Sequence, residues 1–199
     1  MVIGLTGGIG SGKTTVAEFF QRFETVAVYI ADLEAKKIMN SSDVIQTKLI
    51  EEFGKNTYHE NELNNRYLAS IVFNNKEKLH VLNSILHPEV RRNFQEFMQQ
   101  NANKAYILYE SAILFESNSQ YQFDFVVSVF TDLEERIKRV LKRDNSVRQQ
   151  VLNRINNQWK EDKKLLLSNY IINNDSLQET EDAVKNIHKT LTKKGRDML

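Results

Sequence analysis

The chain has 199 residues, a formal net charge of +1 and no cysteine. This length accommodates one domain core with insertions. A hydrophobic fraction of 41% with 27% charged residues is ordinary for a globular protein and suggests neither disorder nor a fibrous repeat. Because basic and acidic residues nearly balance, we do not expect a nucleic acid partner. The absence of cysteine excludes disulfides and thiol catalysis and fits a reducing compartment, so we expect a cytoplasmic protein. No segment approaches the roughly 20 apolar residues needed to span a bilayer, so we expect no membrane contact.

The chain alternates strand-like and helix-like segments. The run at 2–6 is short, apolar and followed by glycines, which predicts a buried strand rather than a signal peptide. Residues 33–103 are predicted to form a helical insertion in which Pro88, the only proline, begins a new helix. The alternation predicts an α/β fold with a mostly parallel sheet. The further predicted strands cover 26–30, 106–109, 125–130 and 170–172.

Three later helix starts show the capping-box pattern, in which a hydroxyl residue is followed three positions later by Glu or Gln. We expect Thr131, Ser146 and Ser176 to cap these helices. The helical segment between 133 and 164 is rich in arginine.

Residues 7–14 match the pattern G-x-x-x-x-G-K-[ST], directly after a predicted strand and before a predicted helix. Glycines let successive backbone N–H groups turn toward a phosphate, and the start of the helix adds its dipole. Lys13 is expected to be an exposed, mobile charge for the β- and γ-phosphates, and the Thr14 hydroxyl is a candidate ligand of Mg²⁺. The alternative, a glycine-rich turn without function, is disfavoured by the complete pattern in this context. The predicted ATP-binding residues of this loop are Gly8, Gly10, Ser11, Gly12, Lys13 and Thr14.

The loop alone leaves three classes of protein open: a kinase of a small molecule, a switch GTPase and a non-catalytic nucleotide-binding protein. The base-reading tetrapeptide N/T-K-x-D of guanine-nucleotide switches does not occur in the chain. A small-molecule kinase needs an acceptor pocket and a lid that excludes water, because water would otherwise take the phosphoryl group. The helical insertion and the arginine-rich helices are candidates for both, although the loop cannot distinguish a nucleotide kinase from a shikimate-type kinase or from another metabolite kinase.

Carboxylates follow two of the predicted strands, and ligands of open α/β sheets collect at the carboxyl ends of strands. Asp32 is therefore a candidate general base or Mg²⁺ ligand, with a helix N-cap before Leu33 as the alternative. Glu110 is a candidate near Mg²⁺ or an ordinary strand-end carboxylate, and Glu116 is a weaker candidate of the same kind.

Arginines at positions 136, 139 and 143 share one face of a predicted helix. Guanidinium groups on one face can clamp triphosphate oxygens, whereas the alternative is a solvated surface paired with nearby acidic residues. Trp159 is expected to contribute to packing rather than to base stacking.

The segment Gly4-Leu-Thr-Gly-Gly-Ile-Gly-Ser-Gly-Lys-Thr-Thr-Val-Ala17 resembles the N-terminal signature of dephospho-coenzyme A kinases. Further similarities follow in order along nearly the whole chain, and they include Ala31-Asp32, His87-Pro88, Ile113-Leu-Phe-Glu116, Arg139 with Arg143-Asp144, Arg154 with Gln158, and Asn173-Asn174. The resemblance implies transfer of the ATP γ-phosphoryl to the ribose 3′-hydroxyl of dephospho-coenzyme A. It also implies a P-loop NTPase fold with a five-stranded parallel core, a helical acceptor domain and an arginine-rich lid.

The resemblance also assigns roles to individual residues. It implies that Lys13, Asp32, Arg139 and Arg143 are catalytic, that Thr15 and Asn174 join the ATP site, and that Asp32, Arg66, His87 and Glu116 contact the acceptor. Mg²⁺ would be held by Thr14, by Asp32 through water and more weakly by Glu110. The chain departs from the family pattern at Ile30, where a first Asp is usual, at Ala112, where Pro is usual, and in the position of Arg66, one residue later than usual.

These expectations divide the chain into three parts. The nucleotide-binding core comprises 1–39, 104–135 and 165–199, the acceptor insertion comprises 40–103, and the lid comprises 136–164. We expect ATP and dephospho-coenzyme A as partners, and a monomer or weak homo-oligomer.

Overall fold

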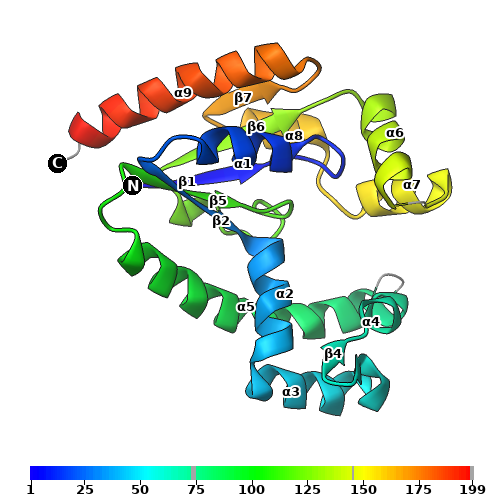
Figure 1. Cartoon of the computed structure of the whole chain (residues 1–199). Coiled ribbons are helices and arrows are strands. Elements are labelled where there is room, and N and C mark those ends of the chain that lie inside the picture. The colour runs from blue at the N-terminus through cyan, green and yellow to red at the C-terminus, as the bar shows by residue number, and fades with distance from the viewer. Residues whose placement is uncertain (73–74, 145, 198–199) are drawn as a thin grey trace. The chain divides into compact units, whose positions relative to one another are not determined.

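The computed structural model describes residues 1–72, 75–144 and 146–197 (Figure 1). The chain divides into two compact units, the first made of 1–30 and 101–199 and the second of 31–100. None of the helices in the described ranges combines the length and the apolar character needed to cross a membrane.

The first unit is built on a five-stranded sheet in which all neighbouring strands are parallel. The five strands expected from the sequence are confirmed, but the strand between β1 and β2 comes from much later in the chain. As a result β1 occupies the centre of the sheet, and the glycine loop leaves its carboxyl end. In spatial order the strands are β2 (Val26–Ile30), β5 (Tyr106–Glu110), β1 (Val2–Thr6), β6 (Phe125–Phe130) and β7 (Tyr170–Asn173).

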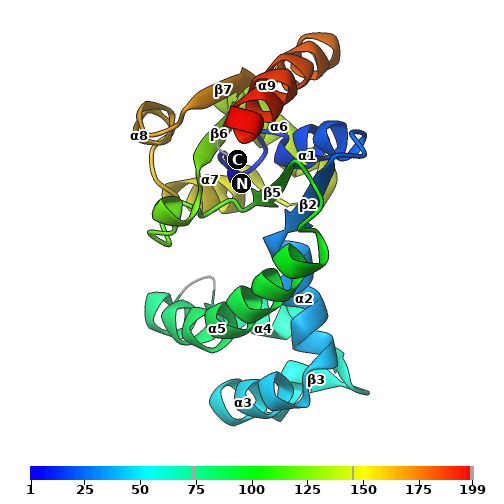
Figure 2. The same ribbon diagram turned by 90° about the vertical axis from the view of Figure 1, so that its left-hand side faces the viewer.

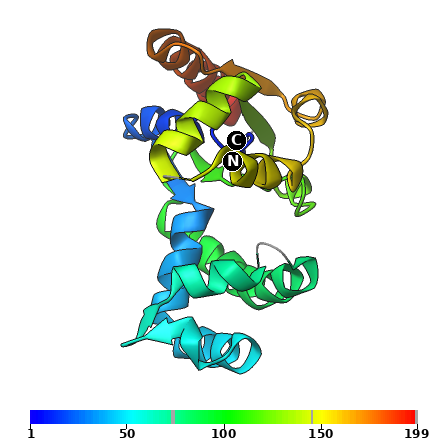
Figure 3. The same ribbon diagram turned by 90° about the vertical axis from the view of Figure 1, so that its right-hand side faces the viewer.

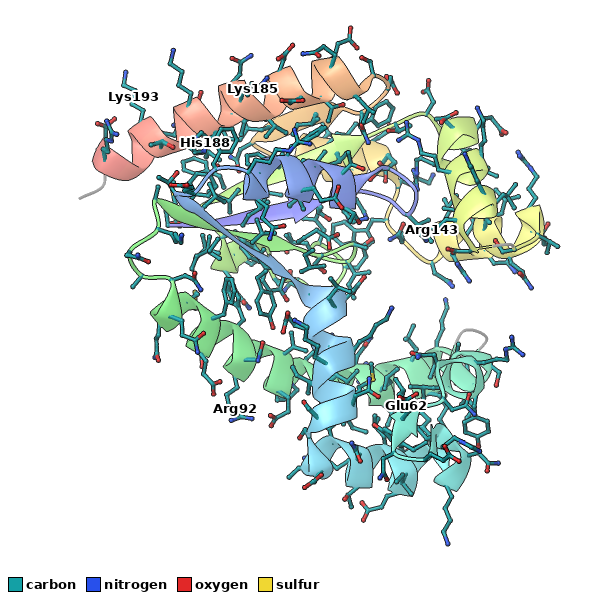
Figure 4. The ribbon with its side chains drawn as sticks, in the orientation of Figure 1. Glu62, Arg92, Arg143, Lys185, His188 and Lys193 are labelled. Atoms are coloured by element: carbon teal, nitrogen blue, oxygen red, sulfur yellow. The ribbon has the colours of Figure 1, made fainter. Side chains whose placement is uncertain are left out.

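Two helices cover one face of this sheet, α1 (Lys13–Gln21) and α9 (Leu177–Asp197). Their apolar side chains, such as Phe20 and Leu191, are fully buried against strand residues such as Leu5. His188 of α9, labelled in Figure 4, accepts or donates a 2.8 Å hydrogen bond with the Tyr106 hydroxyl and stacks on Phe23. The short helix α8 (Glu161–Leu166) lies on the opposite side of the sheet from α1 (Figure 2).

Helices α6 (Leu133–Asp144) and α7 (Arg148–Asn156) lie side by side beyond the carboxyl edge of the sheet (Figure 3). Their contact is a small apolar cluster of Ile137, Val140 and Val151, with Ile9 of the glycine loop packed against it. A short 3-10 helix, η2 (Gln120–Gln122), precedes β6.

Two of the three predicted helix caps are wrong. The buried Thr131 hydroxyl faces the carbonyls of Ser11, Phe130 and Asn174 and accepts from the Arg139 guanidinium at 3.3 Å rather than from a backbone N–H of its helix. The Ser146 hydroxyl has no hydrogen-bond partner. Ser176 does cap α9, since its hydroxyl accepts from the Glu179 N–H at 3.4 Å.

The described part of the second unit contains four α-helices, one short 3-10 helix and, contrary to the purely helical prediction, a small hairpin. The hairpin turn consists of Glu60 and Asn61, whose φ angles of 49° and 66° lie in the left-handed region that a tight two-residue turn requires. The elements are α2 (Ala31–Ser41), α3 (Asp43–Phe53), η1 (Lys55–Thr57), β3 (Tyr58–His59), β4 (Glu62–Leu63), α4 (Asn65–Val72) and α5 (Lys76–Gln100).

The prediction that Pro88 begins a helix is wrong, because α5 continues through it. Four buried side chains at intervals of four residues, Leu82, Leu86, Val90 and Phe94, form one apolar stripe on both sides of Pro88. Burial of this stripe offsets the hydrogen bond that the proline cannot make.

Candidate functional site: a phosphate-binding loop

The glycine loop connects β1 to α1 at the carboxyl edge of the sheet. Its shape depends on left-handed backbone at Gly10 and Gly12, with φ angles of 81° and 90°, which residues with a Cβ rarely adopt. A Cβ on Gly10 would lie 2.5 Å from the Arg136 carbonyl oxygen, and one on Gly12 would collide with the Asn174 side chain. Helix α1 begins at Lys13, so its positive dipole end points into the loop.

Lys13 is buried, with 9% of its surface exposed, so the expectation of an exposed cation is wrong. Its ammonium group donates to the carbonyl oxygens of Gly7 at 3.1 Å and Gly8 at 3.4 Å. The Glu110 carboxylate at the end of β5 lies 4.0 Å from the same nitrogen. The charge of Lys13 is thus held inside the loop by backbone carbonyls and by a buried carboxylate.

Asn174 holds the far side of the loop. This residue follows β7 and is 4% exposed, and its amide nitrogen donates to the Ser11 carbonyl at 2.8 Å. Its amide oxygen accepts from the Thr180 hydroxyl of α9 at 2.9 Å. The Thr131 hydroxyl, after β6, also lies 3.2 Å from the Ser11 carbonyl. The loop is therefore connected to the ends of two strands other than its own.

The three arginines predicted to act together have different surroundings. Arg139 contacts the loop, because its guanidinium donates to the Asn174 carbonyl at 2.9 Å and to the Ser11 carbonyl at 3.5 Å, while Glu135 accepts from Nε at 3.1 Å. The Arg139 hydrogen bond lowers the pKa of the Glu135 carboxyl below its usual value. Arg139 therefore contacts the loop that the sequence predicts to bind phosphate.

Arg143 lies at the carboxyl-terminal end of α6, where Figure 4 labels it, and its side chain is 64% exposed. It forms a two-pronged ion pair with Asp144, at 2.6 and 3.1 Å, and Arg154 reaches the same carboxylate at 2.7 Å. The hydrogen bond from Arg143, assisted by Arg154, lowers the pKa of Asp144. Within the described contacts, Arg143 does not touch the loop.

Arg136 was assigned no separate role in the sequence, yet its side chain lies directly against the loop. It is 3% exposed, and Nε donates to the Ile9 carbonyl at 2.9 Å. Burial lowers the pKa of the guanidinium, an effect that Glu161, 3.5 Å away, opposes. The sequence offered no signal for this contact beyond the helical spacing of the arginines.

Gln158 is a second residue whose role the sequence did not indicate. Its amide oxygen accepts from the Ile9 N–H at 2.8 Å, and its amide nitrogen is 3.4 Å from the Ala112 carbonyl. The neighbouring Trp159 stacks on Phe115 at a centroid distance of 6.2 Å, so it contributes to packing as expected.

Glu116 is engaged in a largely buried ion pair. One carboxylate oxygen accepts from Lys164 at 2.8 Å and from the Trp159 backbone N–H at 2.8 Å, and Lys164 is 1% exposed. The other oxygen is buried without a hydrogen-bond partner. These contacts connect the segment after β5 to α8, and contact of Glu116 with an acceptor stays a prediction.

Three further predicted site residues, Asp32, Arg66 and His87, belong to the second unit and are exposed. Asp32 is the second residue of α2, which begins at Ala31, so it does not occupy the N-cap position considered as an alternative. Arg66 lies in the first turn of α4. His87 lies within α5, where partial desolvation of its ring, and then the charges of Arg91 and His80, lower its pKa.

Among the described residues there is no group of three or more His, Cys, Asp or Glu side chains able to hold a metal ion. Thr14 lies in the first turn of α1 and is exposed, and the Glu110 carboxylate adjoins Lys13. Thr15, next to it in the same turn, is partly exposed.

A glycine loop that holds a buried lysine, at the central strand of a five-stranded parallel sheet, defines the class of P-loop kinases and related phosphotransferases. A solved structure from Thermus thermophilus, named TT1252, has 30% sequence identity and a TM-score of 0.84, with 96% of this chain and 97% of that chain covered. A dephospho-CoA kinase structure from Campylobacter jejuni, 24% identical with a TM-score of 0.64 over 96% and 97% of the two chains, has the same fold.

The family model for dephospho-CoA kinase matches residues 1–180. A curated dephospho-CoA kinase from Bacillus licheniformis is 36% identical over 185 residues, which cover 91% of this chain and 92% of the relative. The chain therefore belongs to the dephospho-CoA kinase family.

Proposed function

We propose that this protein transfers the γ-phosphoryl group of ATP to the ribose 3′-hydroxyl of dephospho-coenzyme A, giving coenzyme A and ADP. The observation that carries the proposal is the phosphate loop, with Lys13 buried among its carbonyls, in a chain that matches the family over residues 1–180. Such a loop binds a nucleoside triphosphate through backbone N–H groups and the ammonium group of its lysine.

The reaction forms one bond and breaks another. The 3′-oxygen of the acceptor attacks the γ-phosphorus, the bond from that phosphorus to the β,γ-bridging oxygen breaks, and ADP leaves with that oxygen. The hydroxyl proton goes to the carboxylate of Asp32.

The position of Asp32 in the chain supports this role. Asp32 follows Ile30, the last residue of β2, by two residues, and Ile30 is in register with Glu110 at the end of β5. The covalent chain thus keeps Asp32 within two residues of the carboxyl edge at which the phosphate loop begins, where ligands of parallel sheets collect.

We assign Mg²⁺ binding to Thr14, to Asp32 through water and more weakly to Glu110. When bound with ATP, the ion supplies charge neutralisation of the phosphate oxygens. Thr14 is exposed, and the Glu110 carboxylate lies 4.0 Å from the Lys13 nitrogen, which is consistent with this donor set.

The remaining assignments concern the acceptor and the lid. We propose that residues 40–103 bind the acceptor, with Arg66 and His87 as contacts and Glu116 as a further contact from outside this segment. Residues 136–164 would form the lid, with Arg139 and Arg143 acting on the phosphates, and the remaining segments would form the nucleotide core. The lack of cysteine supports a reducing, cytoplasmic location.

The test is ADP release at saturating Mg·ATP with dephospho-coenzyme A, AMP, shikimate and pantetheine as acceptors. The proposal requires the highest kcat/KM with dephospho-coenzyme A, because its long arm supplies binding energy that can be used to close the site. A higher value with AMP or shikimate would instead identify another metabolite kinase. ADP release that does not depend on an added acceptor would contradict a kinase function, and so would the absence of any ADP release.

Asp32→Asn tests the proposed base. The amide keeps hydrogen bonding but cannot take up the proton, so kcat should fall by more than about tenfold, or about 1.4 kcal/mol, with little change in ATP affinity. Glu34→Gln, in the same first turn of α2, is the matched control. A smaller loss would leave Asp32 with only a favourable charge at a helix start.

A further inference from the structure

The peptide units around Ile9 in the phosphate loop are held from both sides. The Ile9 N–H donates to the Gln158 amide oxygen at 2.8 Å, and the Ile9 carbonyl accepts from Arg136 Nε at 2.9 Å. Gln158 lies between α7 and α8, and Arg136 lies on α6. Two distant segments therefore fix the orientation of one residue in the loop.

The guanidinium of Arg136 is a buried positive charge beside the Ile9 carbonyl. The Arg136 side chain is 4% exposed, and Glu161 of α8, with which it forms an ion pair, is 16% exposed, with Nη1 and Oε1 3.5 Å apart. A Cβ added to Gly8 would collide with the guanidinium and would lie 2.6 Å from Glu161 Oε1. Both charges consequently lie against the backbone of a loop that binds phosphate.

We propose that Arg136 is a positioning residue of the phosphate loop and that Glu161 sets how much of the Arg136 charge the bound phosphates experience. Since both side chains are nearly excluded from solvent, their charges are weakly screened, and each acts on an anion held by the adjacent loop. Arg136 also aligns the Ile9 peptide through its hydrogen bond. These roles of Arg136 and Glu161 rest on the proposed function in that they require an ATP site at the loop, but they do not depend on the identity of the acceptor.

A purely structural ion pair would behave differently. Removing either partner of such a pair loosens the loop, so both single variants would weaken nucleotide binding. The proposal instead requires opposite signs. Arg136→Gln retains an amide donor for the Ile9 carbonyl and removes the positive charge, so it weakens binding. Glu161→Gln removes the negative charge that offsets Arg136, so it strengthens binding.

The measurement is the Kd of Mg·ADP by isothermal titration calorimetry at low salt, with the full chain. We expect Arg136→Gln to raise Kd about tenfold and Glu161→Gln to lower it about threefold. The double variant should match Arg136→Gln, because Glu161 acts through Arg136. Trp159 is the only tryptophan of the chain and follows Gln158 in the sequence. Its fluorescence on titration with Mg·ADP gives an independent measurement of the same Kd.

Matched controls separate this effect from a general change in charge. Asp162→Asn removes one negative charge next to Glu161, at an exposed position, and Arg148→Gln removes an arginine that is paired with Glu134 on the surface. Both should leave Kd unchanged within about twofold. If Arg136→Gln does not fold, as judged by its melting curve, Arg136→Lys replaces it and should raise Kd by less, because the charge remains while the planar fork is lost.

Kinetics provide the second measurement. Arg136→Gln should raise the KM for ATP and leave the KM for dephospho-coenzyme A unchanged. Weaker ADP binding by Glu161→Gln, or unchanged binding by Arg136→Gln, would overturn the inference. Because ADP binding needs no acceptor, these results stand apart from the acceptor panel, and turnover with a different acceptor would contradict the proposed function alone.

Discussion

Replacing Asn174 with alanine tests whether this residue holds the phosphate loop or contacts the nucleotide. The substitution removes the 2.8 Å hydrogen bond to the Ser11 carbonyl and the 2.9 Å hydrogen bond from the Thr180 hydroxyl. Neither partner is left entirely unsatisfied, because the Thr131 hydroxyl still reaches Ser11 and the Thr180 hydroxyl still reaches Ser176 at 2.7 Å. Two buried neutral hydrogen bonds lost without stranding their partners cost about 1–3 kcal/mol of unfolding free energy.

Urea unfolding measures this loss, and steady-state kinetics measures its effect on the loop. The KM for ATP should rise while the KM for the acceptor stays constant, since the loop binds only the nucleotide phosphates. Asn173→Ala is the matched control, because Asn173 is the same residue type one position earlier and its side chain is exposed. If Asn174→Ala lowers the stability by less than about 0.5 kcal/mol but weakens ATP binding tenfold, Asn174 contacts ATP directly and the reasoning fails.

Three further substitutions test charged residues. Lys13→Met should lower kcat at least about a hundredfold with a native circular dichroism spectrum, since the lost charge acts on the transferring phosphoryl group; retained activity would refute this. Arg143→Lys should lower kcat/KM at nearly unchanged stability, because an exposed ion pair contributes only about 0–1 kcal/mol to folding, and equal activity would leave Arg143 as a surface residue. Lys164→Met should lower the melting temperature and the free energy of unfolding, the latter by about 3–5 kcal/mol, since it removes the counter-ion of the largely buried Glu116 carboxylate. Recovery of stability by adding Glu116→Gln would confirm the cause, and an unchanged melting temperature would contradict it.

The strands of the sheet were predictable because each one is a short apolar run with clear local limits. Their order was not, because β5 reaches its place between β1 and β2 only after the 70 residues of the second unit. Pairing between strands so distant in sequence depends on tertiary packing, which no local pattern contains.

The predicted helix start at Pro88 and the predicted cap at Thr131 were wrong because contacts in the folded chain opposed the local preference of the sequence. Pro88 has the local character of a helix start, but the apolar stripe that includes Leu86 and Val90 continues across it. Thr131 has the capping-box pattern, yet its hydroxyl is drawn to the carbonyls of Ser11 and Asn174 in the core of the site. The loss of a local hydrogen bond is offset in both cases by contacts that form only in the folded chain.

In the candidate site, too, local features could be predicted from the sequence and long-range contacts could not. The phosphate loop could be recognised because all its requirements are local: glycines, a lysine and a following helix. The residues that hold the loop are 120 or more positions away in sequence, as the separations of 127 between Ile9 and Arg136, 149 between Ile9 and Gln158, and 163 between Ser11 and Asn174 show. A polar side chain that far away carries no sign of its partner.

The contacts that hold the loop follow one physical rule, which explains why Lys13 and Arg136 are buried and Arg139 is partly buried. The loop carbonyls are taken by donors: Lys13 binds those of Gly7 and Gly8, Arg136 binds that of Ile9, and Arg139 with Asn174 binds that of Ser11. A peptide unit whose carbonyl turns toward such a donor presents its N–H to the opposite side, where an anion can accept it unless a side chain already does, as Gln158 does for the Ile9 N–H. Each cation therefore orients the loop and adds positive potential to the same place, so its loss should weaken nucleotide binding even where it never touches a phosphate.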